Sequence, residues 1–201
     1  MEWECFYIGP PIDDWDILRL LPDNLHALLQ QINGCTLFHG GLHLRGACRE
    51  PAWHSLREAW RGPQALFKLF PVLDETDVPF AQDCLGDQFV LRQGQVHKLS
   101  AEEGQLETTG LTLGGFLEAA HQDPLNYLSL FPLEKFRQEG RELEPGQLLS
   151  VYPPFIFKES AQGISLQAVP APERLQFLAD LARQVSTLAE GDKVQLKLAE
   201  Q

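Results

Sequence analysis

Histidine, cysteine and aspartate are the residue types in this chain that could carry out catalysis or bind a metal ion. His39 and His43 lie four residues apart, a spacing that on a helix would place two imidazoles on one face. Gly40 and Gly41 between them disfavour a helix, and no glutamate completes a metalloprotease pattern. We therefore predict turn or surface histidines here and no metal site, and we expect His54 on the surface of a helix.

A second group surrounds Cys84. Asp83 and Cys84 could serve as base and nucleophile if the fold brought His97 beside them, but nothing in the sequence does so, and a cysteine next to a leucine is typical of a buried core. Asp83 and Asp87 could also hold a divalent cation. Gly86 between them favours a turn capped by aspartate instead.

Sequence motifs for the common enzyme classes are missing. The chain has no GxSxG, no Walker-type phosphate loop and no GxGxxG. The sequence therefore predicts a non-enzymatic protein without a cofactor, and an enzyme acting on small polar substrates through an unfamiliar site remains the alternative. Tryptophan offers a different chemistry, because Trp3 or Trp15, if exposed beside Asp13, Asp14 and Asp16, would be a credible anchor for a partner.

The elements that must position these residues centre on residues 78–107. Apolar and polar residues alternate through 88–91 and again through 95–99, which predicts two strands. Gln93 and Gly94 separate them, and a two-residue loop ending in glycine suits a hairpin, since glycine reaches positive φ without steric cost. The sequence thus predicts an antiparallel meander at the centre of the fold.

Other elements follow from capping residues and periodicity. We predict helices near 14–21, 23–32, 51–61, 112–120, 124–128, 133–139 and 172–188, and strands near 36–38, 42–44, 147–152, 164–169 and 193–198. Because the strands cluster, the fold class is α+β: a mainly antiparallel central sheet with helices packed on it. The chain length of 201 residues suits one domain, 1–201, and its four irregularly spaced cysteines are expected to be free thiols.

The net charge of −12 is unevenly distributed. Residues 1–18, 69–91 and 99–134 carry many acids and neither lysine nor arginine. Such a surface disfavours direct nucleic-acid binding, which relies on clustered basic residues. It suits either simple solubility or the docking of a basic protein. No apolar run long enough to span a membrane and no signal-peptide pattern is present, so a cytoplasmic, non-membrane protein is expected.

The chain resembles the SUKH superfamily of bacterial immunity proteins, which is related to a fungal regulator of cell-wall synthesis. The resemblance covers about 22–130: a Leu-Pro start, a leucine helix ending at Asn33-Gly34, the Gly-rich segment 41–46, PFAQD at 79–83, GDQF at 86–89, GQVHKL at 94–99 and the helix at 113–117. Cys35 departs from the family pattern, in which a second glycine commonly follows Asn-Gly. The resemblance implies a SUKH-like core over about 15–130. Residues from about 133 to 201 extend beyond the matching part and are predicted to form a C-terminal α/β elaboration.

The resemblance also implies a non-enzymatic function: binding and blocking a cognate toxin, often a basic nuclease, through an acidic face. The alternative within the same superfamily is a regulatory or scaffolding domain with several weaker partners. On the first hypothesis the toxin's Lys and Arg contact the following acids, with Phe80 as a possible aromatic anchor. The predicted partner-binding residues are Asp74, Glu75, Asp77, Phe80, Asp83, Asp87, Glu102, Glu103 and Glu107.

Overall fold

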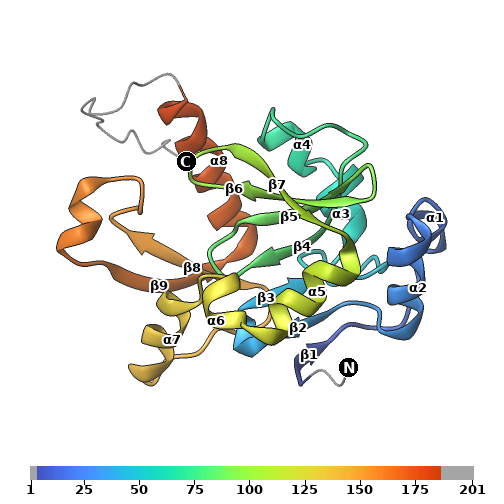
Figure 1. The fold of residues 1–201 in the computed structure, drawn as a ribbon, viewed down its shortest axis with the longest axis horizontal. Coiled ribbons are helices and arrows are strands. Elements are labelled where there is room, and N and C mark those ends of the chain that lie inside the picture. Colours follow the sequence, from blue (N-terminus) through green and yellow to red (C-terminus); the bar gives the residue numbers. More distant parts are fainter. Residues whose placement is uncertain (1–3, 187–201) are drawn as a thin grey trace.

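A seven-stranded antiparallel sheet dominates the computed structural model, which describes residues 4–186 (Figure 1). Its strands lie side by side in chain order, so each pairs with the strand that follows it in the sequence. They are β1 (Cys5–Ile8), β2 (Cys35–Leu37), β3 (Leu42–Leu44), β4 (Val78–Asp83), β5 (Gln88–Arg92), β6 (Gln95–Ser100) and β7 (Gln105–Leu111). A separate antiparallel pair is formed by β8 (Gln147–Tyr152) and β9 (Ser165–Pro170). The α+β class predicted from the sequence is confirmed.

Eight α-helices accompany the strands in the described part of the chain. They are α1 (Trp15–Arg19), α2 (Asp23–Gln31), α3 (Leu56–Arg61), α4 (Leu66–Leu69), α5 (Leu113–Gln122), α6 (Pro124–Tyr127), α7 (Phe131–Gln138) and α8 (Ala171–Val185). Two short 3-10 turns, η1 (Phe38–Gly40) and η2 (Lys158–Gln162), complete the secondary structure. Among residues 4–186, no helix combines the length and the apolar content needed to cross a membrane.

The hairpin at the centre of the sheet forms as predicted. Leu91 in β5 lies opposite Val96 in β6, and the loop residues Gln93 and Gly94 have φ values of 53° and 83°. Two consecutive residues with positive φ give the turn the twist that matches the flanking strands. Local sequence is therefore sufficient to set the register of this strand pair.

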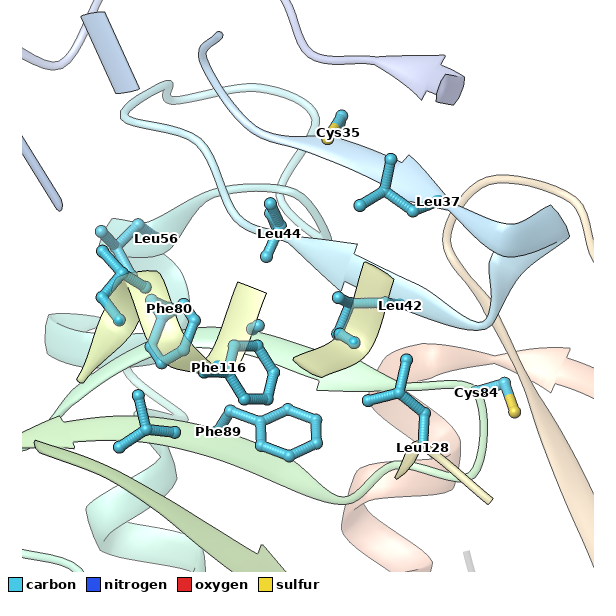
Figure 2. Packing of buried hydrophobic residues seen from close by; sticks show 14 of the residues in the cluster. Cys35, Leu37, Leu42, Leu44, Leu56, Phe80, Cys84, Phe89, Phe116 and Leu128 are labelled. Carbon is cyan, nitrogen blue, oxygen red and sulfur yellow. The ribbon is translucent and has the colours of Figure 1, made fainter. Parts of the chain in front are cut away.

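Both faces of the sheet are covered, because α5 packs in one core cluster and α8 packs in the other. Helix α3 borders both, since Leu56 and Trp60 belong to the α5 cluster and Ala59 packs against the α8 cluster. Alternate residues of β5 divide between the two cores. Phe89 packs in the cluster that contains Phe116 of α5, whereas Val90 packs in the cluster that contains Leu178 of α8. Figure 2 shows the first cluster, in which aromatic and leucine side chains from the strands meet α5.

The C-terminal elements pack directly on the sheet. The Leu149 amide of β8 donates a hydrogen bond to the Cys84 carbonyl at 2.8 Å, and Leu149 and Val151 are buried in the same cluster as the sheet residues. Close packing also occurs at Gly86, where an added Cβ would lie 2.7 Å from Cδ1 of Leu178. The predicted C-terminal elaboration thus shares its core with the elements before it.

Two sequence predictions need correction, and three others concern residues outside the described part of the chain. The helix expected over 51–61 begins at Leu56, because Ser55 caps it and the preceding residues form turns. His54, expected on a helix surface, is fully buried. The strand expected over 193–198, the end of the helix expected to reach 188, and Trp3 all lie outside the described residues.

Candidate functional site

The nine predicted partner-binding residues do not form one exposed face. Four have exposed side chains, two are partly buried and three are buried. The exposed ones are Asp74, Glu75, Glu103 and Glu107; the partly buried ones are Asp87 and Glu102; the buried ones are Asp77, Phe80 and Asp83. The last three therefore cannot contact a partner in this conformation, which corrects the prediction for them.

Phe80 is buried because β4 directs its side chain into the main core. Its ring meets Phe116 edge-on, with 5.5 Å between the ring centroids. Only 1% of the residue is exposed. Phe80 therefore stabilises the fold and is not an aromatic anchor for a partner.

Asp77 is held by Arg92 at the end of β5. The guanidinium donates through Nε to Oδ1 at 2.7 Å and through Nη2 to Oδ2 at 2.6 Å, a bidentate arrangement. The exposed carboxylate of Asp74 lies 3.5 Å from the same Nη2. Much of the negative charge in this turn is therefore matched inside the protein, and the full charge of these acids is not presented to a partner.

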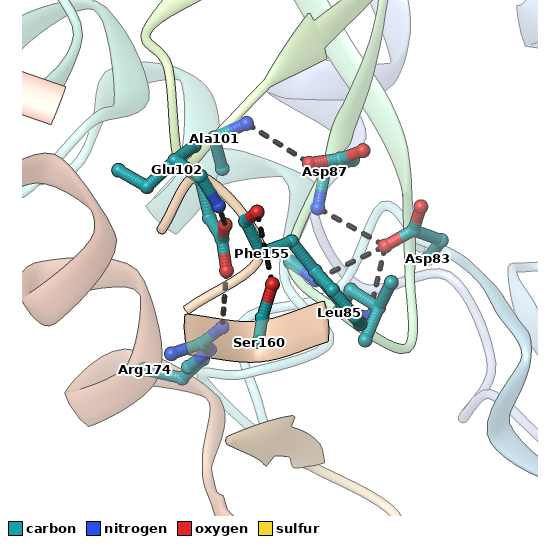
Figure 3. Close-up of polar contacts among 10 residues, drawn as sticks. Asp83, Leu85, Asp87, Ala101, Glu102, Phe155, Ser160 and Arg174 are labelled. Atoms are coloured by element: carbon teal, nitrogen blue, oxygen red, sulfur yellow. Dashed lines mark hydrogen bonds and ion pairs between the residues drawn. The ribbon is translucent and has the colours of Figure 1, made fainter. Parts of the chain in front are cut away.

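Asp83 closes the turn between β4 and β5 (Figure 3). Its Oδ1 accepts hydrogen bonds from the backbone amides of Leu85, Gly86 and Asp87 at 2.9–3.0 Å. Burial, with a contribution from the charge of Asp87, raises the pKa of the Asp83 carboxyl to about 8. The aspartate-capped turn expected from Gly86 is thus present.

Asp87 and Glu102 each have a basic partner in the same region. Asp87 pairs with Lys98 of β6 at 2.9 Å and accepts a hydrogen bond from the Ala101 amide. Glu102 lies 3.5 Å from Arg174 of α8, and burial raises its pKa (Figure 3). Asp87 thus binds within the sheet region and Glu102 connects the segment after β6 to α8, so the main contacts of both acids are within the chain.

The first helix exposes apolar side chains beside acids. Trp15 is 53% exposed and Leu20 is 60% exposed, while Asp13 and Asp16 are also at the surface. Asp14 differs, because it is fully buried, caps α1 through the Ile17 amide and pairs with Arg57 of α3. The side-chain hydrogen bonds from Arg57 lower the pKa of Asp14. Asp14 thus fixes α1 in place while Trp15 faces solvent.

A buried polar network that the sequence does not predict joins His43 of β3 and Gln82 of β4 to His54. Nε2 of His54 contacts the Asn33 carbonyl at 3.1 Å, which fixes Nε2 as the protonated nitrogen and leaves Nδ1 as an acceptor. Nε2 of His43 lies 2.8 Å from that Nδ1 and must donate to it, and Nδ1 of His43 then faces the Gln82 amide at 3.4 Å. Burial lowers the pKa of both histidines, so both are neutral and every hydrogen bond has a defined direction.

Gly9 is expected to be essential for the packing of this network. A Cβ added to Gly9 would lie 2.2 Å from the Asn33 carbonyl oxygen and 2.3 Å from Nε2 of His54. We predict that Gly9→Ala lowers the free energy of unfolding by about 1–3 kcal/mol, the usual cost of overpacking. Urea denaturation measures the change. Gly114→Ala, at a site with open space in α5, is the control, and an equal loss in both variants would contradict the prediction.

Arg45 extends this network to a cavity between α3, α4 and α8. It is 3% exposed, and its Nη2 donates to Oε1 of Gln82 and Oε1 of Gln88, both at 2.7 Å. Its Nη1 donates to the carbonyls of Pro79, at 2.9 Å, and Ala81, at 3.3 Å, on either side of an irregularity in the β4–β5 pairing. In the sequence this site corresponds to an arginine just after β3 and one glutamine each in β4 and β5.

His39 and His43 do not form the paired arrangement considered for metal binding. His43 is bonded to His54, while His39 packs against Phe6 with 6.0 Å between the ring centroids. His43 is therefore a buried histidine and not a surface one. Burial raises the pKa of the Cys84 thiol, and the four cysteines are free. No group of three or more potential metal ligands occurs among the described residues.

The observed fold and sites define an α+β protein with a seven-stranded antiparallel sheet and a packed C-terminal α/β unit. Comparison of the chain with family models, curated proteins and solved structures gives no match.

Proposed function

We propose that this is a non-enzymatic protein-binding domain, an immunity protein that binds and blocks a basic toxin domain in the cytoplasm. The observation that carries the proposal is the exposure of Trp15, the first residue of α1, and of Leu20, the residue just after its end, together with the exposed Asp13 and Asp16. Tryptophan is among the residues most enriched at the energetic centres of interfaces, and surrounding charged groups form the polar rim. The resemblance to the SUKH superfamily supports the same function.

Charge would contribute to association more than to final affinity. Helix α3 contacts both α1 and the turn that carries the exposed acids Asp74 and Glu75: Arg57 pairs with Asp14, and Nε1 of Trp60 donates to the Glu75 carbonyl at 2.9 Å. Exposed acids in this position attract a basic partner over distances of about 10 Å at moderate salt. Binding of a toxin should therefore be fast and sensitive to salt.

The first test is an affinity purification of the tagged protein from its native lysate, washed at low and at high salt. One near-stoichiometric basic partner, retained less at high salt and toxic when expressed alone, supports the immunity function. Several substoichiometric partners support the scaffolding alternative instead.

The role of α1 is tested with the purified partner. We predict that Trp15→Ala weakens binding by a factor of about 30 or more, since loss of a central interface tryptophan typically costs about 2 kcal/mol or more. Surface plasmon resonance measures the dissociation constant, and its increase should come mainly from a faster dissociation rate. Phe131→Ala removes an aromatic side chain of similar exposure, 57%, from α7 and serves as the control. Equal binding by Trp15→Ala and the wild-type protein would remove α1 from the interface.

A further inference from the structure

A cavity of about 380 Å³ is lined by residues of α3, α4 and the start of α8, together with Arg45 and Gln82. This volume is within the range of about 300–1,000 Å³ that is typical of small-molecule sites. Its lining residues divide by exposure. Pro63, Gln64 and Pro172 are at the surface and mark the mouth, whereas Arg45 and Gln82 are buried and mark the floor. The cavity therefore leads from solvent to a buried cation.

The walls between mouth and floor are mainly apolar. They are formed by Trp53 before α3, Ala59 in α3, Leu66 and Leu69 in α4, and Leu175 in α8. Such walls favour the apolar part of a ligand, at about 25 cal/mol for each Å² removed from water.

Arg45 is a buried cation whose hydrogen-bond partners are all uncharged. The guanidinium has five N–H donors, and four of them are used by the two carboxamide and two carbonyl oxygens described above. The fifth donor, Nε–H, donates to no described residue. Since the fully buried atoms that lack a partner do not include Nε, this atom is not fully buried. Arg45 thus has one free donor at the floor of the cavity.

No carboxylate of the described residues forms an ion pair with Arg45. Glu58 also lines the cavity, but the hydrogen-bond partners of the Arg45 guanidinium are the carboxamides and carbonyls named above and do not include it. Arg174, which is also buried, differs in this respect because it lies beside Glu102. Burial lowers the pKa of Arg45 to about 9, so the guanidinium is still charged at neutral pH. A buried positive charge without a negative partner is stabilised by any anion that can reach it.

We propose that this cavity binds a small amphipathic carboxylate, with its apolar part against the walls and its carboxylate accepting a hydrogen bond from Nε of Arg45. One free donor suits a monoanion. A phosphate dianion would bring several acceptor oxygens and a second charge for which the floor has no further free donor on Arg45. This site is distinct from the α1 surface, and the proposal does not depend on the proposed immunity function.

The test compares two probes of equal chain length, octanoate and octan-1-ol, by isothermal titration calorimetry on the full chain. We expect octanoate to bind at least 10-fold more tightly than octan-1-ol, and acetate to give no measurable binding because it lacks the apolar part. If octanoate binds no more tightly than octan-1-ol, or if neither binds at millimolar concentration, the proposal is wrong.

Two pairs of variants assign the effect to the cavity. Arg45→Met should remove the preference for octanoate, while Arg174→Met, which removes a buried arginine outside the cavity, should retain it. Ala59→Phe should fill the cavity and weaken both probes at least 10-fold, while Ala119→Phe, at a partly buried position in α5, should not. Ala59→Phe keeps the proposal testable even if Arg45→Met does not fold. Retention of the octanoate preference by a folded Arg45→Met protein would overturn the role of Arg45, and unchanged binding to Ala59→Phe would overturn the site.

Discussion

Phe116→Ala is expected to lower the free energy of unfolding by about 3–5 kcal/mol, the range observed when a buried phenylalanine is truncated. Phe116 is fully buried on α5 and lies at the centre of the main core (Figure 2). Its ring centroid lies 5.5 Å from that of Phe80, 4.6 Å from that of Phe89 and 5.8 Å from that of Tyr127. Strands β4 and β5 and helix α6 therefore all lose contacts when the ring is removed. Guanidinium denaturation followed by circular dichroism measures the change.

The control for this prediction is Phe131→Ala. Phe131 begins α7 and is 57% exposed, so its truncation removes few contacts and should change stability by about 0.5 kcal/mol or less. A loss in Phe116→Ala no greater than in Phe131→Ala would mean that α5 is not the element that closes this face of the sheet.

The sequence was sufficient to predict the elements whose signals are local. Thr112 accepts a hydrogen bond from the Gly115 amide and starts α5, and Asp123 does the same for α6 through the Asn126 amide. The β5–β6 hairpin depends on Gln93 and Gly94. Each of these features involves residues within a few positions of one another, so the sequence pattern alone contains the information.

The features that the sequence did not predict depend on contacts between distant residues. Residues 51–54 are not helical, because the backbone of His54 and Leu56 hydrogen-bonds with that of Gly46. Asn33 then accepts from the Ala47 amide and contacts His54, which buries that histidine. Nothing near His54 in the sequence distinguishes it from a histidine on the surface of a helix.

The need for contacts between distant residues also explains why the sequence did not identify which acids are exposed. Composition shows that acids are numerous but not which of them find a basic partner. Asp77 pairs with Arg92, 15 residues later, and Glu102 pairs with Arg174, 72 residues later. Burial of Asp77 and Asp83 therefore follows from the fold, and only the exposed acids, such as Asp74 and Glu75, remain candidates for electrostatic docking.

Asp83 is expected to make the protein less stable as pH rises through neutrality. Its pKa is raised to about 8 by burial, with a further contribution from Asp87 that Lys98 opposes. The unfolded chain has an aspartate pKa of about 3.9, so between about pH 4 and pH 8 the native state holds a proton that the unfolded state has lost. Stability from this group is therefore greatest below pH 4 and declines as pH rises, by at most about 1.4 kcal/mol per pH unit.

Asp83→Asn and Asp83→Ala separate the charge of this residue from its role in the turn. Asparagine retains an oxygen for the amides of Leu85, Gly86 and Asp87 but cannot ionise. The free energy of unfolding of Asp83→Asn, relative to that of the wild-type protein, should therefore rise by at least about 1 kcal/mol from pH 5.5 to pH 7.5. Alanine provides no acceptor, so Asp83→Ala should be destabilised by about 1–3 kcal/mol at pH 5.5, where the native carboxyl is protonated. Urea denaturation at the two pH values measures both differences, and titration of the other groups largely cancels in each comparison. A difference between Asp83→Asn and the wild type that does not change with pH would show that the Asp83 carboxyl has an ordinary pKa, and the turn would then hold a buried carboxylate stabilised by its three amide hydrogen bonds.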